Sequence, residues 1–218
     1  MKLITLSGVD GSGKSTQLQL LQTILEQEDK KVFYFHAIEF SSANKISRLF
    51  SGEKEFVAGQ EKASTQASWL SILARRIFLL IDIFRFRDLA KKLERAQFDY
   101  ILSDRYFYDS VVNIEYLSRK DSPSLEPNLT PPPAGGLSSA QERGKFFKRY
   151  IPKPDFAFYL DITPEEILKR DRVPEQGIDY LREKISLFKN NIEQWGMIHI
   201  DASKNQERVS QEIHNHLS

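Results

Sequence analysis

The segment Gly8–Ser15 constrains the fold of this chain more than any other part of its sequence. It reads GVDGSGKS and fits the pattern G-x-x-x-x-G-K-[ST]. A short β-rich run, Lys2–Ser7, precedes it, and residues 14–29, with helical spacing of leucine and isoleucine, follow it. Glycines let successive backbone N–H groups point at one phosphate, and the following helix adds its positive N-terminal end. The sequence therefore predicts an α/β fold with a phosphate site at its first strand–helix junction.

The residues of this loop predict ATP and Mg²⁺ as ligands. Lys14 is expected to reach the β- and γ-phosphates, and the hydroxyl of Ser15 to bind Mg²⁺. The dinucleotide pattern G-x-G-x-x-G does not fit, because its third glycine, counted from Gly11, would be Thr16. The residues expected to bind ATP are Gly8, Gly11, Ser12, Gly13, Lys14, Ser15 and Thr16.

Further strands and helices alternate along the chain. Apolar runs of strand length occupy residues 32–35, 100–103, 156–160 and 197–200, with helical patterns between them. Strands that are apolar on both faces and alternate with helices are typical of a parallel sheet covered on both sides. We therefore expect one domain over residues 1–218, a three-layer α/β/α P-loop fold with a five-stranded parallel sheet.

Two segments between the strands have a distinct composition. Residues 63–97 predict a long helix, and residues 118–144, which hold five of the nine prolines, predict either a functional lid loop or an unstructured insertion. The buried stripe expected on the helix consists of Trp69, Leu73, Ile77, Leu80, Ile81 and Phe84.

Composition excludes several classes of function. Lys plus Arg is 31 and Asp plus Glu is 30, so the net charge of +1 lacks the basic excess typical of nucleic-acid binding. The absence of cysteine excludes disulfides, thiolate metal sites and a cysteine nucleophile. The longest apolar stretch is interrupted by charges, so no membrane span is predicted and we expect a cytoplasmic protein.

Two charged clusters are candidates for the remaining phosphate chemistry. Asp104 and Arg105 follow an apolar strand directly, so they should emerge beside the phosphate loop, where Asp104 can support Mg²⁺ and Arg105 can bind phosphate oxygens. The loop positions 9–12 hold no base, so a catalytic arginine must come from elsewhere, and Arg170 and Arg172 are the best-placed candidates. The alternatives are a surface ion pair for the first cluster and a solvated helix end for the second.

With these motifs in place, the sequence resembles thymidylate kinases. The similar stretches are LITLSGVDGSGKSTQLQLL, YILSDRYFYDS, PDFAFYLDITPEEILKRDR and HIDASKNQERV. The resemblance implies transfer of the ATP γ-phosphoryl group to a nucleoside monophosphate, with dTMP as the expected acceptor. It implies that Asp10 contacts the acceptor, Arg105 holds its phosphate, Arg170 and Arg172 are lid arginines, and residues 202–204 border the adenine. It also allows a homodimer through part of the long helix.

The chain departs from the family at the acceptor site. Where the family carries an arginine after the second strand, residues 35–40 read FHAIEF, and the nearest match to its base-reading phenylalanine–arginine pair is Ile81 with Arg85. Glu39 is the position where nucleoside kinases place a general base, so a nucleoside hydroxyl is an alternative acceptor. The substrate-binding residues expected are Asp10, Glu39, Arg85, Asp104 and Arg105. A third possibility is a nucleotide-binding protein without efficient turnover.

Overall fold

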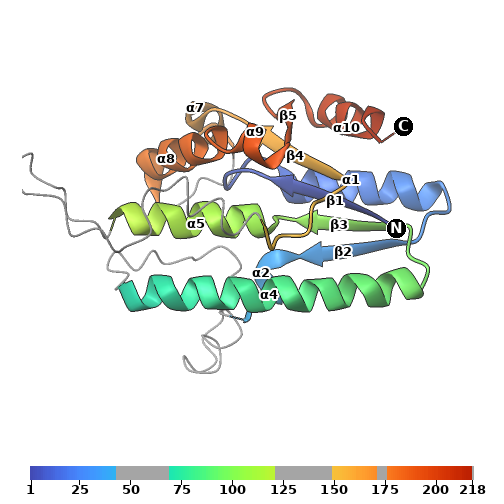
Figure 1. The fold of residues 1–218 in the computed structure, drawn as a ribbon. Helices are drawn as coiled ribbons and strands as arrows, with labels where there is room; N and C mark the ends of the chain where they lie inside the picture. Colours follow the sequence, from blue (N-terminus) through green and yellow to red (C-terminus); the bar gives the residue numbers. More distant parts are fainter. Residues whose placement is uncertain (43–68, 121–148, 171–175, 218) are drawn as a thin grey trace, which may run out of the picture.

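Five parallel strands form one sheet in the order β2-β3-β1-β4-β5 (Figure 1). The computed structural model describes residues 1–42, 69–120, 149–170 and 176–217. The strands are β1 (Lys2–Ser7), β2 (Val32–His36), β3 (Tyr100–Asp104), β4 (Phe156–Asp161) and β5 (Ile198–Asp201). The predicted five-stranded parallel sheet is confirmed, with each strand within one residue of its predicted ends.

Helices cover the two faces of the sheet. Neighbouring β4 residues show this directly, because the ring of Phe158 contacts His216 after α10, whereas the ring of Tyr159 contacts Phe188 of α8. On the α8 side, α4 and α5 run alongside each other (Figure 1). The helices are α1 (Lys14–Gln27), α2 (Ala37–Phe40), α4 (Trp69–Arg95), α5 (Phe107–Lys120), α7 (Pro164–Ile167), α8 (Gly177–Lys189), α9 (Ile192–Trp195) and α10 (Gln206–Asn215).

The register of the sheet brings chemically important strand ends together. β1 pairs with β3 so that Leu6 lies opposite Asp104, and β2 pairs with β3 so that His36 also lies opposite Asp104. Since all strands are parallel, their carboxyl ends share one edge, which is where such folds bind ligands. The loop after β1 and residues Asp104–Tyr106 at the end of β3, which we call the DRY segment, are therefore neighbours.

An aromatic cluster anchors α4 and α5 to the sheet. The Phe86 ring on α4 packs against Phe35 of β2 at 4.8 Å, Tyr106 at 5.8 Å and Phe107 at 5.5 Å between centroids. Phe86 is 1% exposed. This cluster fixes the position of α4 relative to the strand ends.

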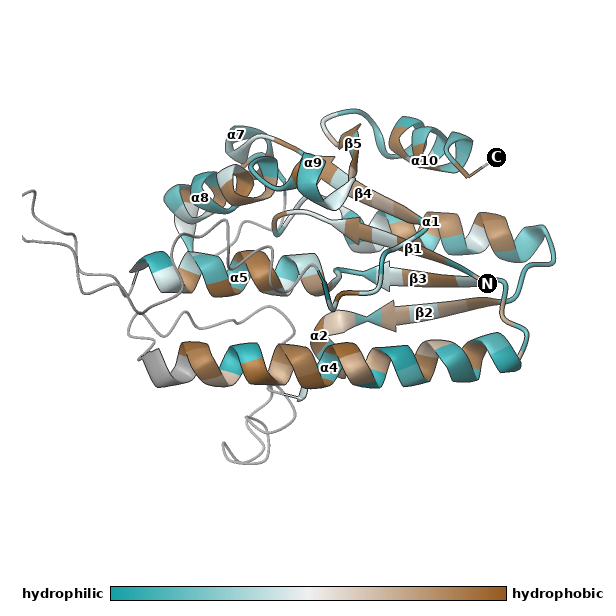
Figure 2. Cartoon of the chain, viewed as in Figure 1, coloured by the Kyte–Doolittle hydropathy of each residue, from teal (hydrophilic) through white to brown (hydrophobic). Residues whose placement is uncertain are grey.

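The predicted buried stripe of the long helix is wrong. Side chains of Leu73, Ile77, Ile81 and Phe84 are exposed by 45, 50, 42 and 55%, while Leu80 is half-buried. The residues of α4 that are buried are Ile72, Leu79, Asp82, Ile83, Phe86 and Leu93. Figure 2 shows apolar residues over much of the N-terminal half of α4, so periodicity alone offered two stripes and could not choose the inner one.

Some expectations fall on residues that the structure does not describe. Residues 63–68 of the predicted long helix and residues 121–144 of the proline-rich segment lie outside the described ranges. Residues 118–120 form the last turn of α5. Within the part of the chain that is described, no helix is both long and apolar enough to cross a bilayer.

The orientation of α4 can be tested by two substitutions on the same helix. Phe86→Ala should lower the free energy of unfolding by about 3–5 kcal/mol, because it leaves a cavity in the core. Phe84→Ala, at a position 55% exposed, should cost only about 0.5 kcal/mol. Urea denaturation of dilute protein measures both, and equal losses would contradict the assigned inner face.

Candidate active site

Three glycines shape the loop between β1 and α1. Gly8, Gly11 and Gly13 have φ angles of +148°, +83° and +97°, in the region that side chains disfavour. At Gly8 space is limiting as well, because a Cβ there would lie 3.0 Å from the Leu160 carbonyl oxygen and 3.0 Å from Ser12 Oγ. The predicted glycine-rich turn thus has the backbone conformation that a phosphate loop requires.

The lysine of the motif is enclosed by its own loop. Lys14 is 5% exposed, and its Nζ donates hydrogen bonds to the carbonyl oxygens of Gly8 and Val9, at 3.0 and 2.8 Å. Burial and the nearby charge of Arg105 lower the pKa of Lys14. The loop therefore holds the ammonium group in place in advance, which is what electrostatic stabilisation of a phosphate requires.

Ser15 and Asp104, the two residues predicted to bind Mg²⁺, are in direct contact. Ser15 Oγ donates to Asp104 Oδ2 at 2.5 Å, and the hydroxyl of Tyr34 on β2 donates to the same oxygen at 2.8 Å. Burial and the Asp104 charge raise the pKa of Tyr34, which keeps its hydroxyl a hydrogen-bond donor. A hydroxyl and a carboxylate are hard oxygen ligands that fit Mg²⁺. Among the described residues there is no group of three or more His, Cys, Asp or Glu that could hold a metal ion.

The backbone at Arg105 is held in an unusual conformation. Its φ of +62° lies in the left-handed region, which is rare for residues other than glycine. The Arg105 N–H donates to the Leu6 carbonyl at 3.1 Å, and its carbonyl accepts from Ser103 Oγ at 2.5 Å. These bonds hold the turn after β3, which carries the Arg105 side chain toward the loop.

A chain of polar contacts links Arg105 to α8. Arg105 Nη2 forms an ion pair with Asp10 Oδ1, the Tyr180 hydroxyl donates to Asp10 Oδ2 at 3.2 Å, and Lys184 Nζ donates to the Tyr180 hydroxyl at 2.6 Å. Burial alone would raise the pKa of Asp10, but the charges of Arg105, Lys14 and Lys184 and the Tyr180 hydrogen bond hold it below its usual range. Asp10 is therefore an ionised carboxylate between cations.

Asp109 is a buried carboxylate directly behind the loop. Its oxygens accept from Ser7 Oγ at 2.7 Å and from the Tyr106 N–H at 2.9 Å. Burial raises the pKa of Asp109, although Lys14 and Arg105 act in the opposite direction. These bonds tie the start of α5 to the end of β1.

Arg170 bridges two backbone segments on the other side of the loop. Its Nη1 donates to the Gly11 carbonyl at 2.6 Å and its Nη2 to the Ala202 carbonyl, after β5, at 2.8 Å. The structure therefore brings Arg170 to the phosphate loop, whereas Arg172 lies outside the described residues.

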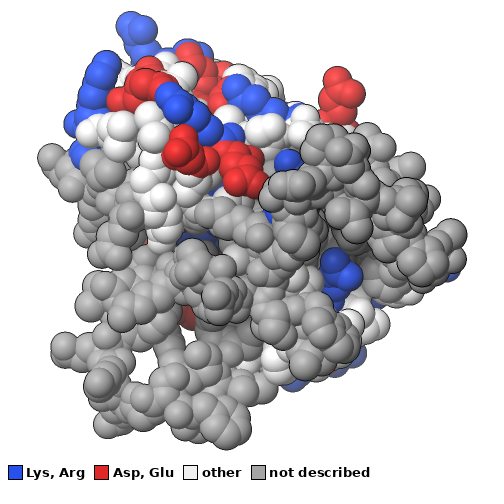
Figure 3. Space-filling model, turned by 90° about the vertical axis from the view of Figure 1, so that its left-hand side faces the viewer, with Lys and Arg blue, Asp and Glu red and all other residues white. Residues whose placement is uncertain are grey.

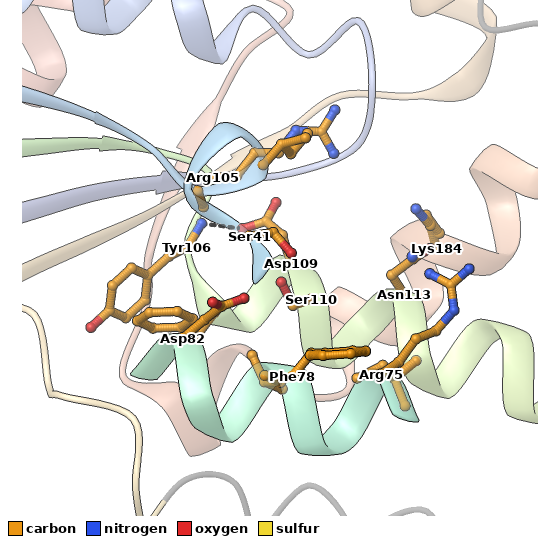
Figure 4. Close-up of a pocket in the computed structure, with 15 residues that line it drawn as sticks. Ser41, Arg75, Phe78, Asp82, Arg105, Tyr106, Asp109, Ser110, Asn113 and Lys184 are labelled. Carbon is orange, nitrogen blue, oxygen red and sulfur yellow. Dashed lines mark hydrogen bonds between the residues drawn. The ribbon is translucent and has the colours of Figure 1, made fainter. Parts of the chain in front are cut away.

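A pocket opens beside this cluster, between α2, α4, α5 and α8 (Figure 4). Arg105 lies at the end nearest the phosphate loop, Phe78 and Asp82 of α4 form the floor, and Asn113 and Lys184 lie along one side. On the described surface of one end of the molecule, basic and acidic side chains are mixed (Figure 3). The described part of this surface therefore shows no patch of a single charge.

Two predicted substrate-binding residues lie away from this pocket. Glu39 is exposed on α2 and does not line it. Arg85 does not line it either, and its Nη1 donates to the Phe40 carbonyl at 3.0 Å, to Ser42 Oγ at 2.6 Å and to Asp82 Oδ1 at 2.8 Å. Arg85 therefore braces Asp82 against the segment after α2.

The aromatic side chain of the pocket differs from the expected pair. Phe78 lines the pocket, whereas Ile81 is 42% exposed and does not. One turn after Phe78 stands an acidic residue, Asp82, and not an arginine. The aromatic ring in the pocket is therefore Phe78, one turn before Ile81, and the role of Arg85 in binding a substrate stays a prediction.

The sequence analysis missed further residues of the site, among them Phe78, Lys184 and Tyr34. Tyr34 could have been found from its place near the carboxyl end of the second strand. Lys184 carried no such signal, because its place depends on how α8 packs against α5.

Comparison with known proteins points to one family, although no protein-family model matches the chain. A probable thymidylate kinase of Methanosphaera stadtmanae is 25% identical over 220 residues, covering 98% of this chain and 96% of that protein. A probable thymidylate kinase of Archaeoglobus fulgidus is 25% identical, covering 97% and 92%. A thymidylate kinase of Prochlorococcus marinus is 26% identical, covering 97% and 93%. The similarity thus extends over nearly the whole of each chain.

The ionised state of Asp10 predicts a pH-dependent contribution to stability. Because its pKa is lower in the folded chain, Asp10 stabilises the fold above the unfolded value of about 3.9, and this stabilisation is lost as the pH falls. Asp10→Asn should cost about 1–2 kcal/mol near pH 7 and progressively less below about pH 4. Urea denaturation at fixed pH measures the difference.

Asp179→Asn is the matched control, because the Asp179 side chain on α8 is 96% exposed. It should change stability little at any pH. A loss for Asp10→Asn that stays constant down to pH 3 would contradict a lowered pKa.

Proposed function

Because the chain is a divergent member of the thymidylate kinase family, we propose that it transfers the γ-phosphoryl group of ATP to a nucleoside monophosphate, with dTMP as the first candidate acceptor. The observation that carries this proposal is the adjacency of two sites. The loop with Lys14 and Ser15 lies beside a pocket, which we call the acceptor pocket, and Arg105 borders both. An ATP phosphate chain and an acceptor can therefore meet at Arg105.

Each of these residues would have a separate role in phosphoryl transfer. Lys14 and the loop N–H groups would hold the β- and γ-phosphates, and Arg105 would face the acceptor side of the transferred group. Ser15 and Asp104 would hold Mg²⁺, which supplies charge neutralisation for phosphoryl transfer when bound. Little covalent work remains, so positioning and charge account for catalysis.

The charges near the pocket favour a monophosphate over a nucleoside as acceptor. A nucleoside hydroxyl would need a carboxylate base, and Glu39, the residue expected for that role, is exposed and does not line the pocket. The two carboxylates that do line it are already engaged, Asp82 with Arg85 and Ser42, and Asp109 with Ser7 and the Tyr106 N–H. A monophosphate needs a cation instead, and Arg105 lines the pocket.

The proposal is tested by an ATP and Mg²⁺ assay across dTMP, dUMP, the other nucleoside monophosphates and the free nucleosides. We expect turnover with a monophosphate. Lys14→Ala should reduce kcat by at least about 100-fold, because it removes a preorganised charge from the transition state.

Lys30→Ala, at an exposed lysine after α1, is the matched control and should leave turnover unchanged. Near-full turnover of Lys14→Ala would overturn the kinase assignment. Turnover with thymidine but not dTMP would instead favour the nucleoside alternative with Glu39 as base, and tight ATP binding without turnover on any acceptor would favour a nucleotide-binding protein.

We further propose that α4 forms a homodimer interface. Leu73, Ile77, Ile81 and Phe84 lie along one side of this helix and are each between 42 and 55% exposed. A contiguous stripe of large apolar side chains on a surface is typical of a protein–protein interface, and a two-fold dimer covers the same stripe on both copies.

Ile77→Glu should convert the dimer to a monomer, because it places a charge in the middle of the apolar stripe. Sedimentation velocity measures the mass of the species. Leu20→Glu, at a 36% exposed leucine on α1, is the control and should leave the mass unchanged. A wild-type chain that sediments as a monomer at all accessible concentrations would contradict the interface.

A further inference from the structure

Lys184 is a buried lysine of the acceptor pocket that belongs to none of the sequence motifs. It lies on the buried side of α8, is 5% exposed and lines the pocket (Figure 4). Taking an ammonium group out of water is costly, so a buried lysine needs a compensating structural or functional role.

Aromatic groups and one hydroxyl orient the ammonium group. Lys184 Nζ donates to the Tyr180 hydroxyl at 2.6 Å and lies 4.6 Å from the centroid of the Tyr180 ring and 6.0 Å from that of Tyr116. The Tyr180 hydroxyl in turn donates to Asp10, which pairs with Arg105. Lys184 and Arg105 are therefore held at the two ends of one short polar chain.

The ionisable side chains that line the pocket carry an excess of positive charge. They are three cations, Arg75, Arg105 and Lys184, and two carboxylates, Asp82 and Asp109. Asp82 is paired with Arg85, which does not line the pocket, and Asp109 accepts hydrogen bonds from Ser7 and the Tyr106 N–H. Asp82 thus has a partner outside the pocket, and Asp109 is held by hydrogen bonds to the end of β1 and the start of α5 while it also faces the charge of Arg105.

The positive charge of the pocket can replace the arginine that the thymidylate kinase family carries after the second strand and that this chain lacks. Residues 36–40 carry no arginine or lysine, so Arg105 would be the sole acceptor-phosphate ligand contributed by the motifs. A phosphate group is bound best by several charge-assisted hydrogen bonds from different directions. Lys184 reaches the same pocket from α8.

We propose that Lys184 is a phosphate-binding residue for the acceptor, which together with Arg105 makes the pocket select an anionic acceptor over a neutral nucleoside. This inference rests on the proposed function, since it assigns the acceptor side of that reaction. Lys184 of α8 would then supply the positive charge that the family places after the second strand, where this chain has residues 36–40.

Direct binding without ATP tests the inference apart from turnover. Isothermal titration compares the Kd of the best-binding nucleoside 5′-monophosphate with that of the corresponding nucleoside. Lys184→Met, which keeps the length and loses the charge, should weaken monophosphate binding by about 10- to 100-fold and leave nucleoside binding unchanged. Lys184→Arg, which keeps the charge, should restore part of the loss.

Lys189→Met is the matched control on the same helix, because its exposed ammonium pairs with Asp161 and does not line the pocket. It should bind both ligands as the wild type does. Should the methionine variant fail to fold, Lys184→Gln makes the same comparison.

The outcomes separate the inference from the proposed function. Equal weakening of monophosphate and nucleoside binding would assign Lys184 a purely structural role, and no weakening would exclude it from the site, so either overturns the inference. A wild-type chain that does not prefer the monophosphate also overturns it. Selective weakening in a chain that transfers no phosphoryl group would support the inference and overturn only the proposed function.

Discussion

The parallel pairing of β1 with β3 is the constraint on which the site depends. With Leu6 opposite Asp104, the phosphate loop and the DRY segment leave the sheet side by side. Ser15 then reaches Asp104, and Asp10 reaches Arg105, although each pair is about 90 residues apart in the sequence. A register shift of one residue would turn every side chain of a strand to the opposite face and would separate these pairs.

Ionised groups at this junction are each compensated by a neighbour. Asp10 lies between Arg105 and the Tyr180–Lys184 pair, and Lys14 is held by loop carbonyls. Because the interior is less polar than water, these charges interact strongly over short distances and an uncompensated one would be costly. The net charge of +1 therefore does not reveal that several ionised side chains of both signs lie together at this site.

The sequence predicted the features that depend on neighbouring residues. The glycine loop, the strand before it and the helix after it follow from residue types at fixed spacing, and the place of Asp104 and Arg105 follows from the shared edge of parallel strands. Prediction from the sequence was wrong for features that depend on how the helices pack on the sheet and on one another. An amphipathic pattern on α4 with two apolar sides led to the wrong inner face, so Phe78, which lines the pocket, was not among the residues predicted. Lys184 lines the pocket because α8 packs on α5, and no local sequence pattern predicts that packing.

Arg170 has a consequence for the geometry of the nucleotide site. One rigid, planar guanidinium spans the Gly11 carbonyl in the phosphate loop and the Ala202 carbonyl after β5. β4 already fixes the distance between the two strands, and the guanidinium joins the backbone segments that follow them. Arg170 thus ties the loop after the central strand β1 to the segment after the edge strand β5, and a lysine, with one point charge, lacks the fixed fork that reaches both carbonyls at once.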